Sequence, residues 1–548
     1  MAGSEVRIFR ARSVVTLDSA VEHADCVAVK DGRVLHTGTF TEVSADLAGR
    51  SPVVDDSFGN SVIVPGFIEG HTHILEEGAL ARFPWIGSYD RRTPDGGVQK
   101  GCPDHASAID RIARAHAESP DHSLVVACLG WDADMAGSPG ITRAMLDGIS
   151  ATRPIFVLQS NGHVGHANTA MLDLAGIIRA SSEKGIVRDA NGEPTGELRE
   201  MALTMVLGPH VQLDAGGRRT AMDAALLSRR AGCTTVTDLA FAATTNAVTE
   251  YASYANDPEF GVRVVYAPLV QLLDMIHDGD VLEHVNGLRA HDSEKFRAGP
   301  TKFVIDGSIQ GRTARLNWPG YCCGSPNGEW LLEPDEMYRA MLPYHRAGHQ
   351  LALHTNGDEA IDRGLDVYER LLNEHPRVDH RHRLEHVQMA TDEAFLRMRA
   401  MGVAANLFAN HVYYWGETHR RDTMGPARAR KLDAAATALR LGVPFSMHSD
   451  APVTPVDPLF TMWCAVNRLT SAGTVLGPSE RITSLQALRA MTIDSAWMLH
   501  LDREMGSIES GKRADFAVLD DDPMTVDPMA IRDIRVAATV LGGRVFAD

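Results

Sequence analysis

The sequence predicts an α/β fold: a TIM-like (β/α)8 barrel with a small β-sandwich domain built from both chain ends and an inserted α+β subdomain after the first barrel strand. Three observations lead to this prediction. Short apolar runs alternate with helix-period stretches through the middle of the chain. Both ends read as short strands separated by turns, and one long interval interrupts the alternation after the first apolar run.

The two chain ends carry the strands of the predicted β-sandwich. Near the N-terminus an Asp-Gly dipeptide, a strong hairpin signal, separates Cys26–Lys30 from Arg33–Thr37. Near the C-terminus a similar pair of apolar runs flanks Gly542-Gly543. Strands at opposite ends of a chain can pair in one sheet, so we expect residues 1–65 and 491–548 to form this domain together.

Eight apolar runs in the middle of the chain are candidate barrel strands. Helix-period segments such as Asp335–Arg346 and Glu359–Leu372 separate most of them, which is the alternation of a parallel βα barrel. In such a barrel the active site lies at the C-terminal ends of the strands. The predicted strands are Ile63–His73, Thr234–Leu239, Val262–Ala267, Lys302–Ile305, Leu351–His354, Leu384–Val387, Val403–Leu407 and Phe445–His448.

The interval from Leu75 to Glu200 is too long for one βα loop. It has strand candidates of its own, such as Ile155–Gln159, and helix candidates such as Ala106–Ala117. We therefore predict an inserted subdomain near the barrel mouth. The predicted division of the chain is 1–65 and 491–548 for the β-sandwich, 66–78 for barrel strand 1, 79–205 for the insertion and 206–490 for the remaining barrel.

The composition is that of a globular protein with an acidic surface. The 548 residues include 53 Lys and Arg against 71 Asp and Glu, a net charge of −18. This charge disfavours nonspecific binding to nucleic acid or to an anionic membrane surface, and no run of about 18 apolar residues predicts a membrane span. The start of the chain lacks a secretory apolar segment, and seven scattered cysteines favour a reducing, cytoplasmic location. A homodimer is our expectation for the assembly.

Histidines are the side chains whose positions point to chemistry. His71 and His73 end the first predicted strand, where residues two apart point to the same side. His354 ends a later strand, His386 lies at the end of the next one, and Asp450 follows the last. Imidazoles and a carboxylate that converge at one barrel mouth suit Zn²⁺ or a similar divalent metal ion.

Lys302 lies among apolar residues in the fourth predicted strand. A free ammonium is costly to bury, so this lysine must be neutralised, paired or modified. An ion pair with Asp306 or another acid is one alternative, and the site would then carry one metal ion.

Taken together, these segments make the chain resemble the amidohydrolase superfamily, and within it the amidohydrolase-3 branch that includes N-substituted formamide deformylases. The resemblance spans nearly the whole chain, and the order and spacing of its pieces are specific. The pieces are Ile63–His73, Asp306–Ser308, Arg312–Ala314, His354–Asp358, Glu385-His386, Ser449–Val453 and Gly506–Asp515.

The resemblance implies a metal-dependent hydrolase with a binuclear centre. Zn²⁺ is the expected metal, and Mn²⁺, Fe²⁺ and Co²⁺ are alternatives. By the same resemblance Lys302 would be carboxylated by CO2, and its carbamate would bridge the two ions as an anion facing cations. The first ion would be held by His71, His73 and Asp450, and the second by His354 and His386.

Four further residues are candidates for substrate contact. His163 lies in a Ser-Asn-Gly-His segment of the insertion, and related enzymes carry a similar histidine there. Trp131 would line the entrance, and Arg312 would bind a carboxylate or brace the Asp306 loop. Asn356 follows the His354 strand, at a position where the family's usual sequence is more apolar.

Two other positions depart from the family pattern. Glu69 stands where family members usually carry Asp, and Gln310 replaces a usually apolar residue. These changes leave the expected metal ligands intact but put the substrate in doubt, since such residues line or brace a pocket.

The expected function is hydrolysis of a non-peptide C–N bond in a small-molecule amide or N-substituted formamide. A metal-bound hydroxide would attack the carbonyl, and Asp450 would accept the proton and deliver it to the leaving nitrogen. One alternative keeps the metals but changes the bond, as in an ester, carbamate or lactone hydrolase or a deaminase. Another is a non-catalytic regulatory homologue, against which the complete set of expected ligands counts.

Overall fold

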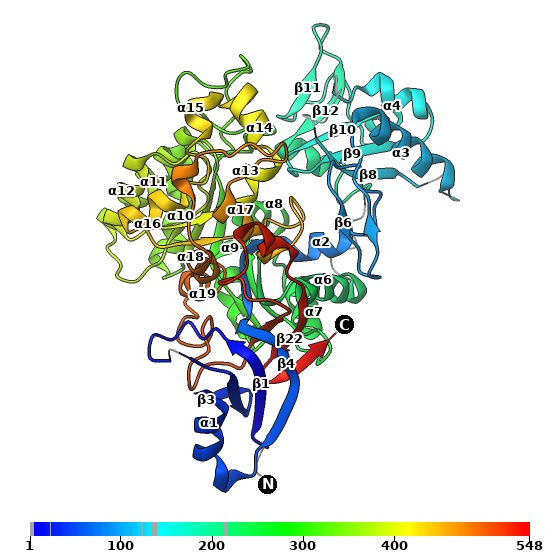
Figure 1. Cartoon of the computed structure of the whole chain (residues 1–548). Coiled ribbons are helices and arrows are strands. Elements are labelled where there is room, and N and C mark those ends of the chain that lie inside the picture. The colour runs from blue at the N-terminus through cyan, green and yellow to red at the C-terminus, as the bar shows by residue number, and fades with distance from the viewer. Residues whose placement is uncertain are drawn as a thin grey trace.

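The computed structural model describes residues 5–21, 23–119, 121, 124–132, 140–211 and 217–547. Figure 1 shows a central body of strands wrapped by helices, with a sheet from the two chain ends below it and a further strand-and-helix unit at the upper right. This arrangement is a TIM-barrel-like fold with two additions.

Parallel strands form the barrel in two hydrogen-bonded sheets, ordered β15-β14-β13-β5 and β16-β17-β18-β19-β20. A bridge between Leu269 and Lys302 links the end of β14 to β16, so β15 and β16 occupy successive parts of one barrel position. The strands are β5 (Phe67–Thr72), β13 (Cys233–Phe241), β14 (Arg263–Pro268), β15 (Phe296–Ala298), β16 (Thr301–Val304), β17 (Leu351–Thr355), β18 (Arg383–His386), β19 (Ala404–Leu407) and β20 (Phe445–Met447).

The first predicted strand, Ile63–His73, divides at Gly66. β4 (Val53–Pro65) ends before this glycine and belongs to the sheet of the chain ends, whereas β5 begins after it and belongs to the barrel. A Cβ atom on Gly66 would lie 2.1 Å from the Thr234 Oγ1 atom. The close approach of the Thr234 side chain therefore requires glycine where the chain passes from one sheet into the other.

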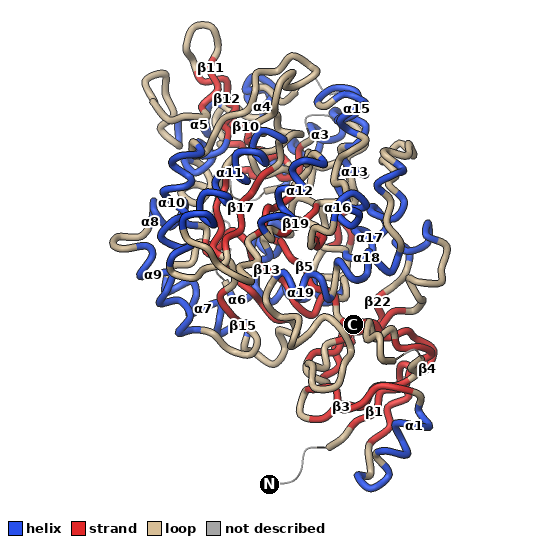
Figure 2. The backbone as a smooth tube through the Cα atoms, turned by 90° about the vertical axis from the view of Figure 1, so that its left-hand side faces the viewer, coloured by secondary structure: helices blue, strands red, loops and turns tan. Residues whose placement is uncertain are grey.

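Helices cover the outside of the barrel strands, as Figure 2 shows. In α11 (Asp358–Glu374) the side chains of Ile361, Leu365, Tyr368 and Leu371 are buried, a spacing that places them on one helical face. Two acidic residues in its first turn interact favourably with the positive end of the helix dipole and so stabilise the helix. Other helices around the barrel are α6 (Arg218–Arg230), α7 (Thr245–Ala255), α10 (Pro334–Arg346), α12 (Asp392–Met401), α16 (Ala435–Leu441), α17 (Pro458–Asn467), α18 (Ser484–Ala490) and α19 (Ile493–Met498).

The predicted β-sandwich of the chain ends is one seven-stranded sheet in the described residues. Neighbouring residues of its strands face opposite sides. Ile63 and Val518 belong to the domain's own hydrophobic core, whereas Val64 and Ala517 pack in the core that includes the barrel. Helix α1 (Phe40–Asp46) covers part of another face. The strand order is β23 (Arg544–Ala547), β22 (Val536–Leu541), β21 (Phe516–Leu519), β4, β1 (Arg7–Val14), β2 (Cys26–Lys30) and β3 (Arg33–Gly38).

The long interval after β5 folds into a sheet of its own. Its strand order is β11-β12-β10-β9-β8, and buried side chains on its two faces belong to separate cores. The chain reaches it through α2 (Ile74–Leu80), β6 (Arg91–Arg92) and β7 (Val98–Gln99). Its elements are α3 (His105–Glu118), β8 (Val126–Trp131), α4 (Arg143–Ile149), β9 (Ile155–Gln159), β10 (Val164–Ala167), α5 (Thr169–Leu174), β11 (Ile186–Arg188) and β12 (Pro194–Arg199).

All seven cysteines are free thiols, and Cys322 and Cys323 are the two that lie exposed. In the part of the chain that the structure describes, no helix combines the length and the apolar character needed to cross a bilayer. The cytoplasmic location stays a prediction.

We expect Gly66→Ala to destabilise the protein by about 1–3 kcal/mol, because the added methyl group overlaps Thr234 and forces the two strands apart. Thermal unfolding of the purified variant measures the effect. Gly148→Ala is the matched control, since its Cβ would meet nothing within 4 Å. Equal melting temperatures for the two variants would contradict the role of Gly66.

Candidate metal centre

One cavity of about 280 Å³ at the barrel mouth gathers all six expected metal ligands. His71 belongs to β5, His354 to β17 and His386 to β18, and Lys302 lies in β16. His73 and Asp450 follow β5 and β20. Because the strands are parallel, their carboxyl ends meet at one mouth of the barrel. The insertion and the loops after the strands line the rest of the cavity.

His71, His73 and Asp450 form the first cluster of donor atoms. The Asp450 Oδ1 atom lies 3.2 Å from His71 Nε2 and 3.3 Å from His73 Nε2. This oxygen is buried without a hydrogen-bond partner among the described residues. Two imidazole nitrogens and an unpartnered carboxylate oxygen at these distances are a donor set that could hold a divalent metal ion.

The Asp450 carboxyl group is ionised in this setting. Burial alone would raise its pKa, but the adjacent His73 ring and the neighbouring His448 and Lys302 lower the pKa to about 2. Asp450 also has a backbone φ of 55°, and His386 has a φ of 66°. Such left-handed conformations cost energy for residues other than glycine and cluster at functional sites.

His354 and His386 form a second pair of donors. The His354 Nδ1 atom lies 3.0 Å from His386 Nε2. On its other side His354 Nε2 lies 3.0 Å from the Gly307 carbonyl oxygen, an arrangement in which Nε2 carries the proton and Nδ1 keeps its lone pair. Burial lowers the pKa of both rings well below the usual value, so both are neutral, the form that binds metals.

Lys302 is buried in the lining of the same cavity, and its Nζ has no hydrogen-bond partner among the described residues. Burial lowers the pKa of the amine to about 8, against the attraction of Glu385 and Asp450. A lowered pKa increases the neutral fraction of the amine, which is the form that reacts with CO2. The site therefore fits a carboxylated lysine. Asp306, the alternative ion-pair partner, instead accepts hydrogen bonds from the backbone of Arg315, Asn356 and Gly357.

Glu385 orients the ring of His71. Its Oε2 atom lies 2.8 Å from His71 Nδ1 and accepts a hydrogen bond from the Asn406 side chain at 2.7 Å. Arg383 forms an ion pair with the same carboxylate at 2.6 Å. A carboxylate on Nδ1 leaves His71 Nε2 with its lone pair toward Asp450, which is the usual support of a metal-binding histidine.

His163 reaches the cavity from the insertion. Its ring meets the His354 ring edge-on, with centroids 5.5 Å apart. Its Nδ1 atom lies 2.8 Å from Glu200 Oε2. Burial alone would lower the pKa of His163, but the Glu200 carboxylate raises it. His163 is thus the substrate-contact candidate that the structure places in the cavity lining.

The other three substrate-contact candidates lie outside this lining. Trp131 is fully buried in a core of the insertion beside Cys128. Arg312 lines a different cavity of about 340 Å³, on the far side of Glu200. The Asn356 side chain donates to the Gly307 carbonyl at 2.8 Å and so braces the His354 strand end.

Three further buried residues lie at the centre, and the sequence predicts a metal-ligand role for none of them. Glu385 supports His71, and Glu69 accepts a hydrogen bond from the Ser449 backbone at 3.0 Å. Burial raises the pKa of Glu69 to about 8. His448 completes a second possible metal group with His71 and His386. The sequence signal for two of these residues is the period of a strand, in which residues two apart point to the same side: Glu69 is two residues from His71, and His448 is two residues from Asp450.

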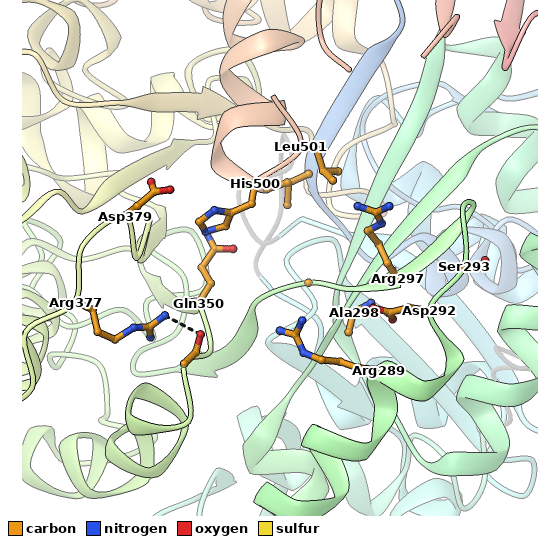
Figure 3. A pocket seen from close by; sticks show the side chains of 13 residues that line it. Arg289, Asp292, Ser293, Arg297, Ala298, Gln350, Arg377, Asp379, His500 and Leu501 are labelled. Atoms are coloured by element: carbon orange, nitrogen blue, oxygen red, sulfur yellow. Dashed lines mark hydrogen bonds between the residues drawn. The ribbon is translucent and has the colours of Figure 1, made fainter. Parts of the chain in front are cut away.

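A larger cavity, of about 470 Å³, lies at the amino-terminal ends of β17 and β18 (Figure 3). Arg289, Arg297 and Arg377 surround it, and Arg377 donates to the Gly348 carbonyl at 2.7 Å. Arg297 pairs with Glu504. The described residues around this cavity contain no group of donors that could hold a metal ion, so the barrel mouth carries the candidate site.

The model of the amidohydrolase family matches residues 59–547, and this range includes every residue of the candidate centre. The chain belongs to the amidohydrolase family.

Relatives within this family match the chain over almost its whole length. An N-substituted formamide deformylase from Arthrobacter pascens is 29% identical over 97% of this chain and 96% of its own. The Protein LONG AFTER FAR-RED 3 of Arabidopsis thaliana is 27% identical over 97% of this chain and 90% of its own. The crystal structure of an uncharacterized metal-dependent hydrolase from Pyrococcus horikoshii aligns with a TM-score of 0.72 at 20% identity, covering 96% and 99% of the two chains.

We expect Glu385→Gln to weaken divalent-metal binding by about 10- to 100-fold, because the loss of the carboxylate leaves His71 Nδ1 without its charged partner. Competition with a coloured chelator measures the affinity. Glu480→Gln is the control, since Glu480 is equally buried but binds Thr437 far from the centre. Unchanged affinity in a folded Glu385→Gln protein would contradict this role.

Proposed function

We propose that this amidohydrolase is a metal-dependent hydrolase that cleaves a non-peptide C–N bond, in an amide or an N-substituted formamide. The observation that carries the proposal is the shared Asp450 carboxylate, which faces the Nε2 atoms of two histidines while a second histidine pair and Lys302 line the same cavity. The similarity to an N-substituted formamide deformylase supports the choice of bond.

The proposed centre is binuclear, with Zn²⁺ as the expected metal and a carbamate on Lys302 between the two groups of donors. When bound, such ions lower the pKa of water toward neutrality and polarise a carbonyl group. The proposed ligands are His71, His73, Lys302, His354, His386 and Asp450.

Asp450 is the proposed proton carrier. It is ionised at neutral pH and lies at the cavity wall, so it can accept a proton from the attacking water. The same carboxyl group then delivers the proton to the leaving nitrogen. Its second oxygen, Oδ2, lies 3.7 Å from His386 Nδ1, so the side chain reaches both groups of donors.

His163 is the proposed hydrogen-bond donor to the substrate carbonyl. Glu200 accepts from Nδ1 and raises the pKa of the ring, which favours a proton on the nitrogen that faces the cavity. A charged donor at this place stabilises negative charge on the carbonyl oxygen as the bond to nitrogen breaks.

The cavity wall favours a small apolar group on the substrate nitrogen. The cavity is lined, together with the histidines, by five apolar side chains, here called the apolar wall: Leu80, Trp85, Leu129, Leu158 and Val453. A volume of about 280 Å³ accommodates a small molecule rather than a polymer. The proposed partner is therefore a small-molecule amide. A homodimer and a cytoplasmic location complete the proposal.

Chelation should abolish hydrolysis of N-substituted formamides, and adding Zn²⁺ or Mn²⁺ back should restore it, because the proposed chemistry requires the ions. Metal analysis of purified protein should give about two ions per chain. The experiment compares N-formyl, N-acyl and cyclic amides with matched esters and with a deamination assay. Turnover restricted to esters or to deamination would replace the C–N hydrolase proposal, and a metal-free protein with full activity would end it.

Asp450→Asn should lower kcat by at least about 100-fold while leaving the fold intact, because the amide cannot accept the proton. Steady-state kinetics with a formamide substrate gives the rate, and circular dichroism checks folding. Asp502→Asn serves as the control, since Asp502 pairs with Arg381 away from the cavity. A kcat within threefold of wild type would remove Asp450 from proton transfer.

A further inference from the structure

His448 is a buried histidine that the proposed ligand set does not use. It directly follows β20 and precedes Asp450 by two residues, and its side chain is fully buried. Neither of its ring nitrogens has a hydrogen-bond partner. Within the described residues, it is the one histidine with both nitrogens buried and unpartnered.

Two other buried histidines, His349 and His345, have a hydrogen-bond partner for each ring nitrogen. His349 lies 3.1 Å from the Thr301 hydroxyl through Nδ1 and 2.8 Å from Asn286 through Nε2. His345 lies 2.9 Å from His382 through Nδ1 and 2.8 Å from the His375 carbonyl through Nε2. Buried polar atoms in native proteins almost always have a partner. The two free nitrogens of His448 therefore point to a ligand that the protein atoms alone do not supply.

The surroundings of His448 indicate what that ligand is. Its ring stacks on His71, with centroids 4.6 Å apart and planes 14° apart, and stacks on Phe408 at 4.9 Å. The His386 ring meets it edge-on at 5.1 Å. One nitrogen each from His71, His386 and His448 lie within 4.8 Å of one another. Three imidazoles in this arrangement are a donor set of the kind that zinc sites use.

We propose that His448 supplies an additional nitrogen ligand to the metal centre, beside His71 and His386. This inference rests on the proposed metal-dependent hydrolase function and deepens it. Phe408 blocks one ring face, so the ring is held in place by packing.

A nitrogen-rich centre has a consequence for the choice of metal. Imidazole ligands favour Zn²⁺, Co²⁺ and Ni²⁺, whereas carboxylate and water ligands suit Mn²⁺. A fifth imidazole therefore shifts the preference of this centre away from Mn²⁺. The preference should depend on residue 448 itself.

The first test is the metal affinity of His448→Gln, measured by chelator competition with Zn²⁺, Co²⁺ and Mn²⁺. We expect at least about a tenfold loss for Zn²⁺ and Co²⁺ and a smaller loss for Mn²⁺. His345→Gln is the matched control, because it removes a buried histidine whose partners, His382 and the His375 carbonyl, are not among the proposed ligands or next to one in sequence. Equal Zn²⁺ affinity in wild type and folded His448→Gln overturns the inference and leaves His448 as a packing residue against Phe408.

A second test gives a new signal rather than a loss. His448→Cys loaded with Co²⁺ should show a thiolate-to-cobalt charge-transfer band that wild type lacks. His411→Cys is the control, since His411 contacts Phe408 as His448 does but belongs to no group that could hold a metal ion among the described residues. No band in a folded, cobalt-loaded His448→Cys protein overturns the inference. If wild type itself binds no metal, the proposed function fails with it; if wild type binds two ions and only residue 448 proves irrelevant, the inference alone fails.

Discussion

The buried carboxylate of Asp450 is the constraint around which the barrel mouth is organised. An ionised carboxylate removed from water costs much free energy unless opposite charge or donors compensate it. Its Oδ1 atom faces His71 and His73 without a hydrogen bond, and burial holds the pKa of His71 well below its usual value. Bound cations would supply the missing compensation. The same cations would also compensate Lys302 as the proposed carbamate, because a carbamate is an anion.

Support for this centre comes from parts of the chain that are far apart in sequence. Glu385 fixes the ring of His71 across 314 residues, and the Gly307 carbonyl fixes His354. The parallel strands place these groups at one mouth, and left-handed turns at His386 and Asp450 aim the side chains inward. A rigid outer shell of this kind lets the ligands keep their positions before any metal ion binds, which lowers the cost of binding.

The TIM-like barrel and the set of six expected ligands could be predicted because both follow from local sequence patterns. Alternation by two aligns His71 with His73, and the βα order places strand ends together. Such periods do not determine how segments that are far apart in the sequence pack against one another. Trp131 ends β8 and turns into the core of the insertion, which depends on how α3 packs. The break at Gly66 depends on contact with Thr234, a residue of another strand.

The candidate metal donors and the apolar wall of the cavity come from different parts of the chain. The donors come from barrel strands, whereas Leu129, Leu158 and His163 come from the insertion and Leu80 and Trp85 from the segment that leads to it. Changes in the insertion can therefore reshape the apolar wall without moving Asp450 or the histidines. His163 is the exception, because its ring touches His354 while Glu200 holds it from the insertion side. Under the proposed function, a substrate would contact that histidine and the apolar wall together, so the insertion would select both the group on nitrogen and the orientation of the carbonyl.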